Sequence, residues 1–290
     1  MSNPLYTTLV LSGGGAQGIA FIGFYKKLKE KNLHSSIKQV IGTSAGALFG
    51  AVFTLQLSDE AIMDLVEGYH GFKGFNLDNL AKIFTSLGLD NGTRILNLLS
   101  SAFQTKFGHL KLDPFKVTFI EWAKLTGFDL IVVATNIMPH KQHKQHKQHC
   151  QHFSMDNTPD AEVFMALRAS IAIPILFEPV LYKGNLYIDG CIFENIPHLE
   201  EDVKRYAVYA IIQKKEKDEK LESLTFATYL YCLGRIFLKR ILGQGVEISG
   251  AGLIVNIDIG DLLTFNFTTC SFSGTSKDVK LAIDVGYNSF

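Results

Sequence analysis

The sequence carries no net charge, because 28 basic and 28 acidic residues cancel over 290 residues. Without a positive field the chain has no general means of holding nucleic-acid phosphates, so we expect no nucleic-acid partner. Cysteine is scarce, and the four residues lack the paired spacing of a metal site: Cys150, Cys191, Cys232 and Cys270. No apolar run reaches the roughly 18 residues of a membrane-spanning helix. The composition therefore indicates a globular protein with reduced thiols.

The chain also lacks an N-terminal basic region followed by a cleavable apolar segment. We therefore expect a cytoplasmic protein, while peripheral attachment to a membrane and export without an N-terminal signal stay open. Hydrophobic residues, by contrast, make up 47% of the chain and charged residues only 19%, which is enough for a large core. The sequence predicts a single domain over residues 1–290, with a core at about 5–200 and further strand and helix elements at 203–290.

A serine flanked by glycines, Gly42-Thr43-Ser44-Ala45-Gly46, follows an apolar stretch at 37–41 and precedes a predicted helix at 45–57. Glycines two residues away on each side allow a strand to turn sharply into a helix and leave the hydroxyl exposed. The free N–H groups of the helix N-terminus favour developing negative charge there. The pattern predicts a nucleophilic serine, and a simple strand-to-helix turn is the alternative.

A second glycine-rich stretch, Ser12-Gly13-Gly14-Gly15-Ala16-Gln17-Gly18, lies between an apolar segment at 5–11 and a helical pattern at 19–31. It satisfies the dinucleotide fingerprint, which requires an acidic residue after the second strand. Ser44 and its neighbours stand there instead. We therefore interpret the N–H groups of Gly13, Gly14 and Gly15 as an oxyanion hole facing Ser44, with structural glycines as the alternative.

The nucleophile needs a base, and no histidine offers an evident one. Five of the nine histidines lie in one polar repeat, and His34, His70, His109 and His198 have no suggestive neighbours. Asp189 is the better candidate because it ends a predicted strand directly before Gly190. Its apolar flanks would raise the pKa of the carboxyl group toward that of a useful base. An aspartate that closes a turn is the plainer interpretation.

The remaining pattern alternates strands and helices, which predicts parallel strands with right-handed crossovers. Strands are expected at 128–135, 206–213 and 253–259, with a hairpin at 177–182 and 185–188. Helices are expected at about 59–69, 94–103, 114–124, 159–170 and 277–287. The segment 214–220 is predicted to be a solvated connector. The amphipathic segment 221–242 is predicted to be a surface helix, with a membrane-interface helix as the alternative.

The segment 139–152 repeats His-Lys-Gln every three residues and contains Cys150. Histidines and a cysteine this dense can bind a transition metal. A period of three, however, does not keep to one face of an α-helix, and nothing in the flanking sequence would fix a rigid site. We predict a disordered polar loop and assign neither a metal ligand nor a cofactor.

Three motifs in this order resemble the patatin-like phospholipase family: Ser12-Gly13-Gly14-Gly15-x-x-Gly18, Gly42-Thr43-Ser44-Ala45-Gly46, and Asp189-Gly190 with Asn195-Ile196-Pro197. The segment 166–174 and Gly286-Tyr287 in the last predicted helix extend the similarity. It spans about residues 5–290, with 139–152 as an insertion.

The resemblance implies an α/β fold, a three-layer α/β/α sandwich with a mostly parallel central sheet. It also implies a Ser-Asp dyad without histidine and metal-free hydrolysis of acyl esters of lipids. Ser44 would attack the ester carbonyl and form an acyl-enzyme, Asp189 would act as the base, and the amides of Gly13 to Gly15 would hold the oxyanion. Gly18, Gly42, Gly46 and Gly190 would support these motifs.

The expected partner is a phospholipid or another acyl-ester lipid at a membrane surface, and a protein activator stays open. Two positions depart from the family pattern. Gln17 stands where the family usually has Arg or Lys, and Cys191 follows Asp189-Gly190 where a further glycine is common. Two other functions therefore stay open: a general carboxylesterase, and a non-catalytic lipid- or partner-binding module on a decayed hydrolase scaffold.

Overall fold

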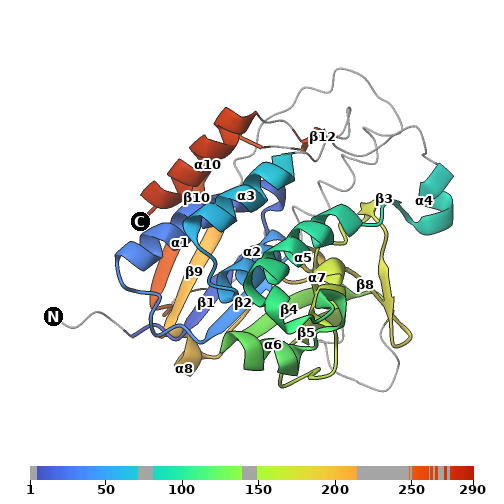
Figure 1. Ribbon diagram of the computed structural model, residues 1–290, viewed down its shortest axis with the longest axis horizontal. Coiled ribbons are helices and arrows are strands. Elements are labelled where there is room, and N and C mark those ends of the chain that lie inside the picture. Colours follow the sequence, from blue (N-terminus) through green and yellow to red (C-terminus); the bar gives the residue numbers. More distant parts are fainter. Residues whose placement is uncertain are drawn as a thin grey trace.

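The fold is built on an eight-stranded mixed sheet flanked by helices, as the computed structural model shows (Figure 1). The structure describes residues 5–70, 81–138, 149–213, 248, 250–260, 262–263, 265–266, 271–272 and 275–290. In the main sheet the strand order is β10-β9-β1-β2-β4-β8-β7, and β5 pairs with β4. The expected α/β class with a mostly parallel central sheet is confirmed.

Five neighbouring strands are parallel: β1 (Thr8–Leu11), β2 (Gln39–Thr43), β4 (Asp129–Asn136), β9 (Ala207–Gln213) and β10 (Leu253–Asp258). Three strands pair antiparallel at one edge: β5 (Cys150–Phe153), β7 (Val180–Tyr182) and β8 (Asn185–Asp189). Strands β3 (Gly88–Asp90) and β6 (Ile175–Phe177) form a separate parallel pair, and β11 (Phe265–Asn266) and β12 (Ser271–Phe272) an antiparallel one.

The described α-helices are α1 (Ala20–Glu30), α2 (Ala45–Thr54), α3 (Asp59–His70), α4 (Ala81–Ser86), α5 (Thr93–Phe107), α6 (Phe119–Thr126), α7 (Val163–Ser170), α8 (Glu201–Lys204) and α10 (Ser276–Asn288). Short 3-10 helices are η1 (Gly15–Ile19), η3 (Gly108–Leu110), η4 (Pro114–Lys116) and η6 (Gly190–Ile192). Among the described helices, none is long and apolar enough to cross a membrane.

The largest core lies on one face of the sheet. Leu9 and Leu11 of β1 point to this face, where they join apolar residues of α1, α2, α5 and α7. Val10 points to the other face and packs with Tyr209 and Ile196 in a smaller cluster. Because side chains alternate along a strand, the consecutive apolar residues Leu9 to Leu11 of β1 require cover on both faces, as the apolar pattern at 5–11 predicted.

Strand β8 continues the line of β2 along β4. Thr43, the last residue of β2, pairs with Val133 of β4, and Asp189, the last residue of β8, pairs with Ala134. β5 pairs with both β4 residues, so it occupies the opposite side of β4. The carboxyl ends of β2 and β8 therefore meet, which brings Asp189 beside the residue that follows Thr43.

Most predicted elements form, but several of their boundaries are wrong. The single helix predicted at 114–124 is η4 followed by α6, because Thr118 and Glu121 form a capping box that starts a new helix. The helix predicted from 159 begins at Val163. The last helix, predicted from 277, begins at Ser276 and is capped by Thr275, whose hydroxyl accepts a hydrogen bond from the N–H of Asp278.

The pairing of β3 with β6 was not predicted, because such short strands carry no readable period. The loop predicted at 139–152 is wrong at its end, where Cys150–Phe153 is a strand that β4 holds by backbone pairing. The predicted connector at 214–220 and surface helix at 221–242 lie outside the described residues.

Candidate active site

Ser44 occupies a sharp turn between β2 and α2. Its backbone lies at φ 53° and ψ −120°, a region that non-glycine residues rarely adopt. The Ser44 N–H donates a hydrogen bond of 2.8 Å to Ser170 Oγ, and Ser170 Oγ donates one of 2.6 Å to the Val133 carbonyl. Ser170 is fully buried at the end of α7. The turn is therefore fixed by α7 and β4 as well as by its own glycines.

The Ser44 hydroxyl and the Asp189 carboxylate are in direct contact. Ser44 Oγ donates to Asp189 Oδ2 at 2.7 Å, and the N–H of Cys191 donates to Asp189 Oδ1 at 2.8 Å. Ser44 is 4% exposed and Asp189 is 2% exposed. In such a dry site a carboxylate holds a hydroxyl proton far more strongly than it would in water. The sequence predicted these two residues as a pair, and the structure places them in direct contact.

The glycine loop lies against this pair. A Cβ atom at Gly13 would collide with Cys191 Sγ, lie 2.6 Å from Asn195 Oδ1 and lie 3.4 Å from Ser44 Cβ. The backbone of Gly13 therefore approaches Ser44 in a way that a side chain would prevent. Its N–H, however, donates to the Asn195 carbonyl at 3.3 Å. This bond leaves Gly14 and Gly15, rather than all three glycines, as candidate donors to a bound oxyanion.

Gly14 and Gly15 differ in their surroundings. A Cβ at Gly14 would lie 2.8 Å from Ile212 Cγ1 of β9, whereas one at Gly15 would meet no atom within 4 Å. Gly15 has φ +57°, the left-handed region that favours glycine, and it begins η1. Within the described residues, the N–H groups of Gly14 and Gly15 have no hydrogen-bond acceptor. They are therefore available to a ligand.

The other motif glycines allow close packing around the turn. A Cβ at Gly42 would strike the backbone of Gly46, and one at Gly46 would strike the carbonyl of Leu11. A Cβ at Gly18 would lie 2.6 Å from Ala45 Cβ. A Cβ at Gly190 would collide with the Val133 carbonyl. These four glycines thus hold α2, η1 and η6 tightly around Ser44, as supporting positions.

Of the two positions that depart from the family pattern, Gln17 is buried and Cys191 is half-buried. Gln17 is buried, and its Nε2 donates to the carbonyls of Gly260 and Leu262, at 3.2 and 3.0 Å. Its side chain therefore anchors the segment after β10. Cys191 places its sulfur against Gly13, beside the dyad.

Sequence reasoning missed three residues that hold the site. Ser170 receives the N–H of Ser44, Thr43 Oγ1 donates to the Glu194 carbonyl at 3.0 Å, and the carbonyl of Asn195 receives the N–H of Gly13. Ser170 lies in the segment 166–174 and Asn195 in Asn195-Ile196-Pro197, both of which carried the resemblance. Nothing in their local pattern indicates these contacts, which depend on distant strands.

Arg168 on α7 fastens the segments next to the site. Its Nε donates to the Asn91 carbonyl at 2.5 Å and its Nη2 to the Glu178 carbonyl at 2.6 Å. Burial lowers the pKa of Arg168 to about 10, against the raising effects of Glu178 and Asp90. The side chain is still cationic at neutral pH. It therefore ties the loops around β3 and β6 to the helix that carries Ser170.

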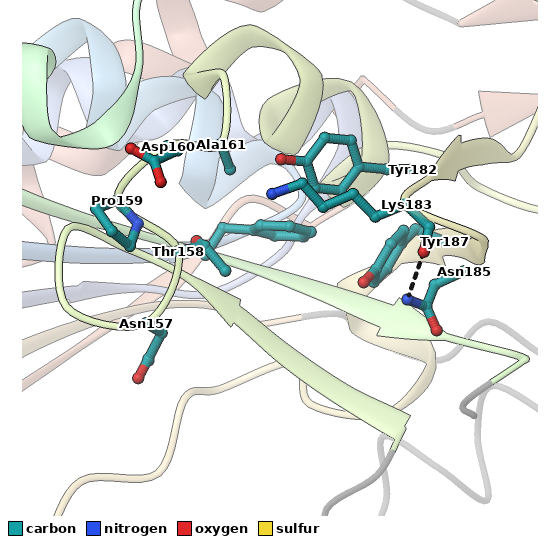
Figure 2. Close-up of a pocket in the computed structure, with 10 residues that line it drawn as sticks. Asn157, Thr158, Pro159, Asp160, Ala161, Tyr182, Lys183, Asn185 and Tyr187 are labelled. Carbon is teal, nitrogen blue, oxygen red and sulfur yellow. Dashed lines mark hydrogen bonds between the residues drawn. The ribbon is translucent and has the colours of Figure 1, made fainter. Parts of the chain in front are cut away.

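A surface pocket of about 300 Å³ lies apart from the dyad (Figure 2). Figure 2 shows the loop with Asn157 to Ala161 on one side and the hairpin residues Tyr182, Lys183 and Tyr187 on the other. Neither Ser44 nor Asp189 lines it. Among the residues that line the pocket, no hydroxyl is hydrogen-bonded to a carboxylate, so Ser44 and Asp189 stay the candidate site.

The structure combines a mostly parallel sheet flanked by helices with a serine at a strand-to-helix turn that faces a carboxylate, which is an α/β architecture with a candidate nucleophile. The family model described as patatin-like phospholipase matches residues 9–201, more than half of the sequence. The chain belongs to the patatin-like phospholipase family. Strands β9 and β10 lie beyond the matched residues and complete the same sheet.

Relatives agree with this assignment. The chain is 30% identical to the "Probable lipid hydrolase 463L" of Invertebrate iridescent virus 6, over 89% of this chain and 80% of the relative. It is 23% identical to "Lysophospholipase NTE1" of Eremothecium gossypii, over 66% of this chain but 11% of that protein. The crystal structure of VipD from Legionella pneumophila superposes with a TM-score of 0.65 at 19% identity, covering 99% of this chain and 66% of VipD.

Proposed function

We propose that the protein is a lipid acyl hydrolase of the phospholipase A type, which cleaves fatty acyl esters through an acyl-enzyme on Ser44. The observation that carries the proposal is the 2.7 Å hydrogen bond from Ser44 Oγ to Asp189 Oδ2, between residues 145 positions apart in the chain. Membership of the patatin-like phospholipase family and the name of the viral relative support a lipid substrate.

In the first half-reaction Ser44 Oγ attacks the ester carbonyl while Asp189 Oδ2 accepts its proton. The tetrahedral intermediate collapses, the proton passes from Asp189 to the leaving alkoxide, and the acyl group stays on Ser44. In the second half-reaction Asp189 takes a proton from water, and the resulting hydroxide attacks the acyl-serine. The fatty acid leaves and the proton returns to Ser44. No metal or other cofactor takes part in this scheme.

The oxyanion is proposed to bind to the N–H groups of Gly14 and Gly15. Both are without an acceptor among the described residues, while the N–H of Gly13 is held by the Asn195 carbonyl. One such donor is worth about 3 kcal/mol of transition-state stabilisation. Gly13 contributes differently, because its lack of a side chain lets the loop approach Ser44.

A membrane surface is proposed as the place where the enzyme meets its substrate. Phe84 is 83% exposed and Leu87 is 56% exposed, and Gly88 next to Leu87 pairs with Ile175, which is also exposed. From Ile175 the chain leads back over five residues to Ser170, the partner of the Ser44 N–H. This apolar patch (Phe84, Leu87 and Ile175) suits contact with lipid close to the site.

The test combines labelling with fatty-acid release. A fluorophosphonate probe is expected to label the wild-type protein and to leave Ser44→Ala unlabelled. Release of fatty acid from phosphatidylcholine vesicles is expected to fall on the order of 10⁴-fold in Ser44→Ala and in Asp189→Asn. Ser101→Ala and Asp64→Asn, on α5 and α3, are the matched controls and are expected to retain activity.

Two outcomes would replace this proposal. Labelling with hydrolysis of short soluble esters but not of vesicle lipids would favour a general carboxylesterase. A wild-type protein that neither reacts with the probe nor releases fatty acid would favour a non-catalytic lipid- or partner-binding module, for which the sulfur of Cys191 beside Gly13 and Ser44 is the motivating contact. Full activity in both dyad variants would overturn the mechanism.

A further inference from the structure

The end of the histidine-rich segment contributes to a cluster that catalysis does not use. Cys150 and His152 lie on β5, and Glu194 lies in the loop after η6. Cys150 Sγ donates to Glu194 Oε2 at 3.0 Å, and His152 Nε2 lies 2.5 Å from the same oxygen. A thiol, an imidazole and a carboxylate thus converge on one point, although Glu194 follows His152 by 42 positions.

The sheet explains why this cluster forms. Cys150 and His152 alternate with Gln151 along β5, so their side chains leave the same face of the sheet. They pair with Thr135 and Val133 of β4. Gly190, which begins η6, contacts these two β4 residues through the Thr135 hydroxyl and the Val133 carbonyl. The loop that follows η6 therefore brings Glu194 over the two β5 side chains.

We propose that Cys150 Sγ, His152 Nε2 and Glu194 Oε2 form a Zn²⁺ site with a fourth position open to water. All three ligand atoms lie within 4.8 Å of one another, and all three residues are partly exposed, so an ion can enter. Three protein ligands with one open position is a common arrangement for zinc. Thiolate and imidazole favour zinc over Mg²⁺ or Ca²⁺, which prefer oxygen ligands.

The geometry needs little change to accept the ion. In a tetrahedral zinc site the ligand atoms stand about 3.4 to 3.6 Å apart, from bond lengths of about 2.0 to 2.3 Å. The present separations are 2.5 Å between His152 Nε2 and Glu194 Oε2 and 3.0 Å between Cys150 Sγ and Glu194 Oε2. These two separations would therefore each open by less than about 1 Å, and the third, between Cys150 Sγ and His152 Nε2, is within 4.8 Å. Zinc would displace the thiol proton and any proton on His152 Nε2.

Glu194 is also held on its other side. Its Oε1 accepts from the N–H of His198 at 3.0 Å, and its backbone carbonyl accepts from Thr43 Oγ1. Burial favours the protonated acid, but the hydrogen bond and charge of His152, with Cys150 and the His198 N–H, outweigh this effect and lower the pKa of Glu194. A fixed carboxylate costs little further ordering when it binds an ion. A zinc ion would fasten β5 to the loop that precedes Asn195.

The test uses the full chain with His140→Gln, His143→Gln and His146→Gln, which removes three histidines of the repeat and leaves His149 and His152. This parent is expected to bind one equivalent of Zn²⁺ in competition with a chromophoric chelator. Co²⁺ is expected to give a near-ultraviolet thiolate-to-cobalt charge-transfer band. Cys150→Ser and His152→Gln are each expected to weaken Zn²⁺ binding by at least about 100-fold, and Cys150→Ser to remove the cobalt band.

His149→Gln is the matched control, because His149 lies beside β5 but its Nδ1 is engaged by the Asn136 carbonyl at 2.8 Å. It is expected to leave Zn²⁺ affinity unchanged. Saturating zinc is expected to raise the melting temperature of the parent but not that of Cys150→Ser. Without metal, Cys150→Ser should have the same melting temperature as the parent. A parent that binds no zinc overturns the proposal. Equal zinc affinity in the parent, Cys150→Ser and His152→Gln would also overturn it. The same holds for a cobalt band that is lost in Cys191→Ser but kept in Cys150→Ser.

Discussion

At the scale of single residues, the site depends on buried polar groups that satisfy one another. The Ser44 hydroxyl donates a hydrogen bond to Asp189, and the Ser44 N–H donates one to the Ser170 hydroxyl. The Ser170 hydroxyl in turn donates to the Val133 carbonyl. Each bond contributes modestly, but a buried donor or acceptor left without a partner costs much more. The strained turn at Ser44 is therefore held by side chains that take no part in the proposed chemistry.

Ser170→Ala is expected to remove this support without touching the dyad. The Ser44 N–H and the Val133 carbonyl would both lose their partner, which should lower the free energy of unfolding by about 1–3 kcal/mol. Since the turn would shift, kcat on ester substrates should fall about tenfold to a hundredfold with less change in KM. Urea denaturation and steady-state kinetics measure the two effects. Ser101→Ala on α5 is the control, and unchanged kcat in Ser170→Ala would contradict the role.

Asp129→Asn is expected to stabilise the protein at neutral pH. Burial raises the pKa of Asp129, against the hydrogen bond from Gln39 Nε2, and the charge of Asp156 raises it further. An acid whose pKa is raised on folding favours folding below its ordinary value near 3.9 and loses that contribution as pH rises through the higher folded value. The asparagine variant should therefore gain stability at pH 7, and the gain should shrink toward pH 3.

Urea melts of Asp129→Asn and wild type across this pH range measure the difference. Asp64→Asn, at an exposed position of α3, is the control. Its free energy of unfolding should differ little from that of the wild type at either pH 3 or pH 7. An equal change at pH 3 and pH 7 would show that packing, rather than charge, causes the effect.

At the scale of elements, two contacts decide where the chain can place its functional groups. The carboxyl ends of β8 and β2 meet on the same side of β4, which places Asp189 next to Ser44. α10 packs directly on α1, as Figure 1 shows for the red and blue helices. A Cβ at Gly23 would strike the Ile283 carbonyl, and one at Gly286 would strike the Ala20 carbonyl. Glycine on both helices permits this close approach.

Gly286→Ala is expected to destabilise the protein by about 1–3 kcal/mol, because the new methyl group meets rigid backbone. On helix propensity alone the same substitution would stabilise the protein by about 1 kcal/mol. The sign of the change in the free energy of unfolding therefore separates the steric effect from the propensity effect. Chemical denaturation gives the free energy of unfolding. Lys280→Ala on the exposed side of α10 is the control and should change it by no more than about 0.5 kcal/mol. A stabilised Gly286→Ala variant would show that the helices can separate without cost.

At the scale of the whole molecule, the balance of 28 basic and 28 acidic residues leaves no long-range attraction to an anionic surface. Contact with a lipid surface must then come mainly from apolar side chains. The exposed patch of Phe84, Leu87 and Ile175 is the group on which the membrane proposal depends.

Phe84→Ser is expected to weaken binding to phosphatidylcholine vesicles about tenfold or more, because a buried phenylalanine contributes about 1.5–3 kcal/mol. Hydrolysis of a soluble short-chain ester should stay unchanged, since the Phe84 side chain is exposed whereas both dyad residues are buried. Vesicle sedimentation and the two activity assays separate the effects. Leu281→Ser, at an exposed position of α10, is the control. Equal vesicle binding by wild type and both variants would remove the patch from the proposal.

Local sequence patterns predicted much of the fold. The apolar runs that became β1, β2, β4 and β9 were identifiable because inner parallel strands bury both faces, whereas β10, at the edge of the sheet, buries alternate residues. Boundaries set by side-chain caps, such as Thr118 and Thr275, were misplaced by up to several residues, since nearby polar residues compete for the same role. The strand at Cys150 was missed because its pairing with β4, rather than its own polar sequence, makes it a strand.

The sequence by itself determined the candidate nucleophile, its candidate base and the glycines that permit the turn, because each depends on residue type within a short motif. Only the tertiary structure decided that the N–H of Gly13 is occupied, that Ser170 supports Ser44, and that Glu194 joins Cys150 and His152. Those contacts join residues on separate strands and loops. Their distances follow from the register of the sheet, which no local pattern specifies.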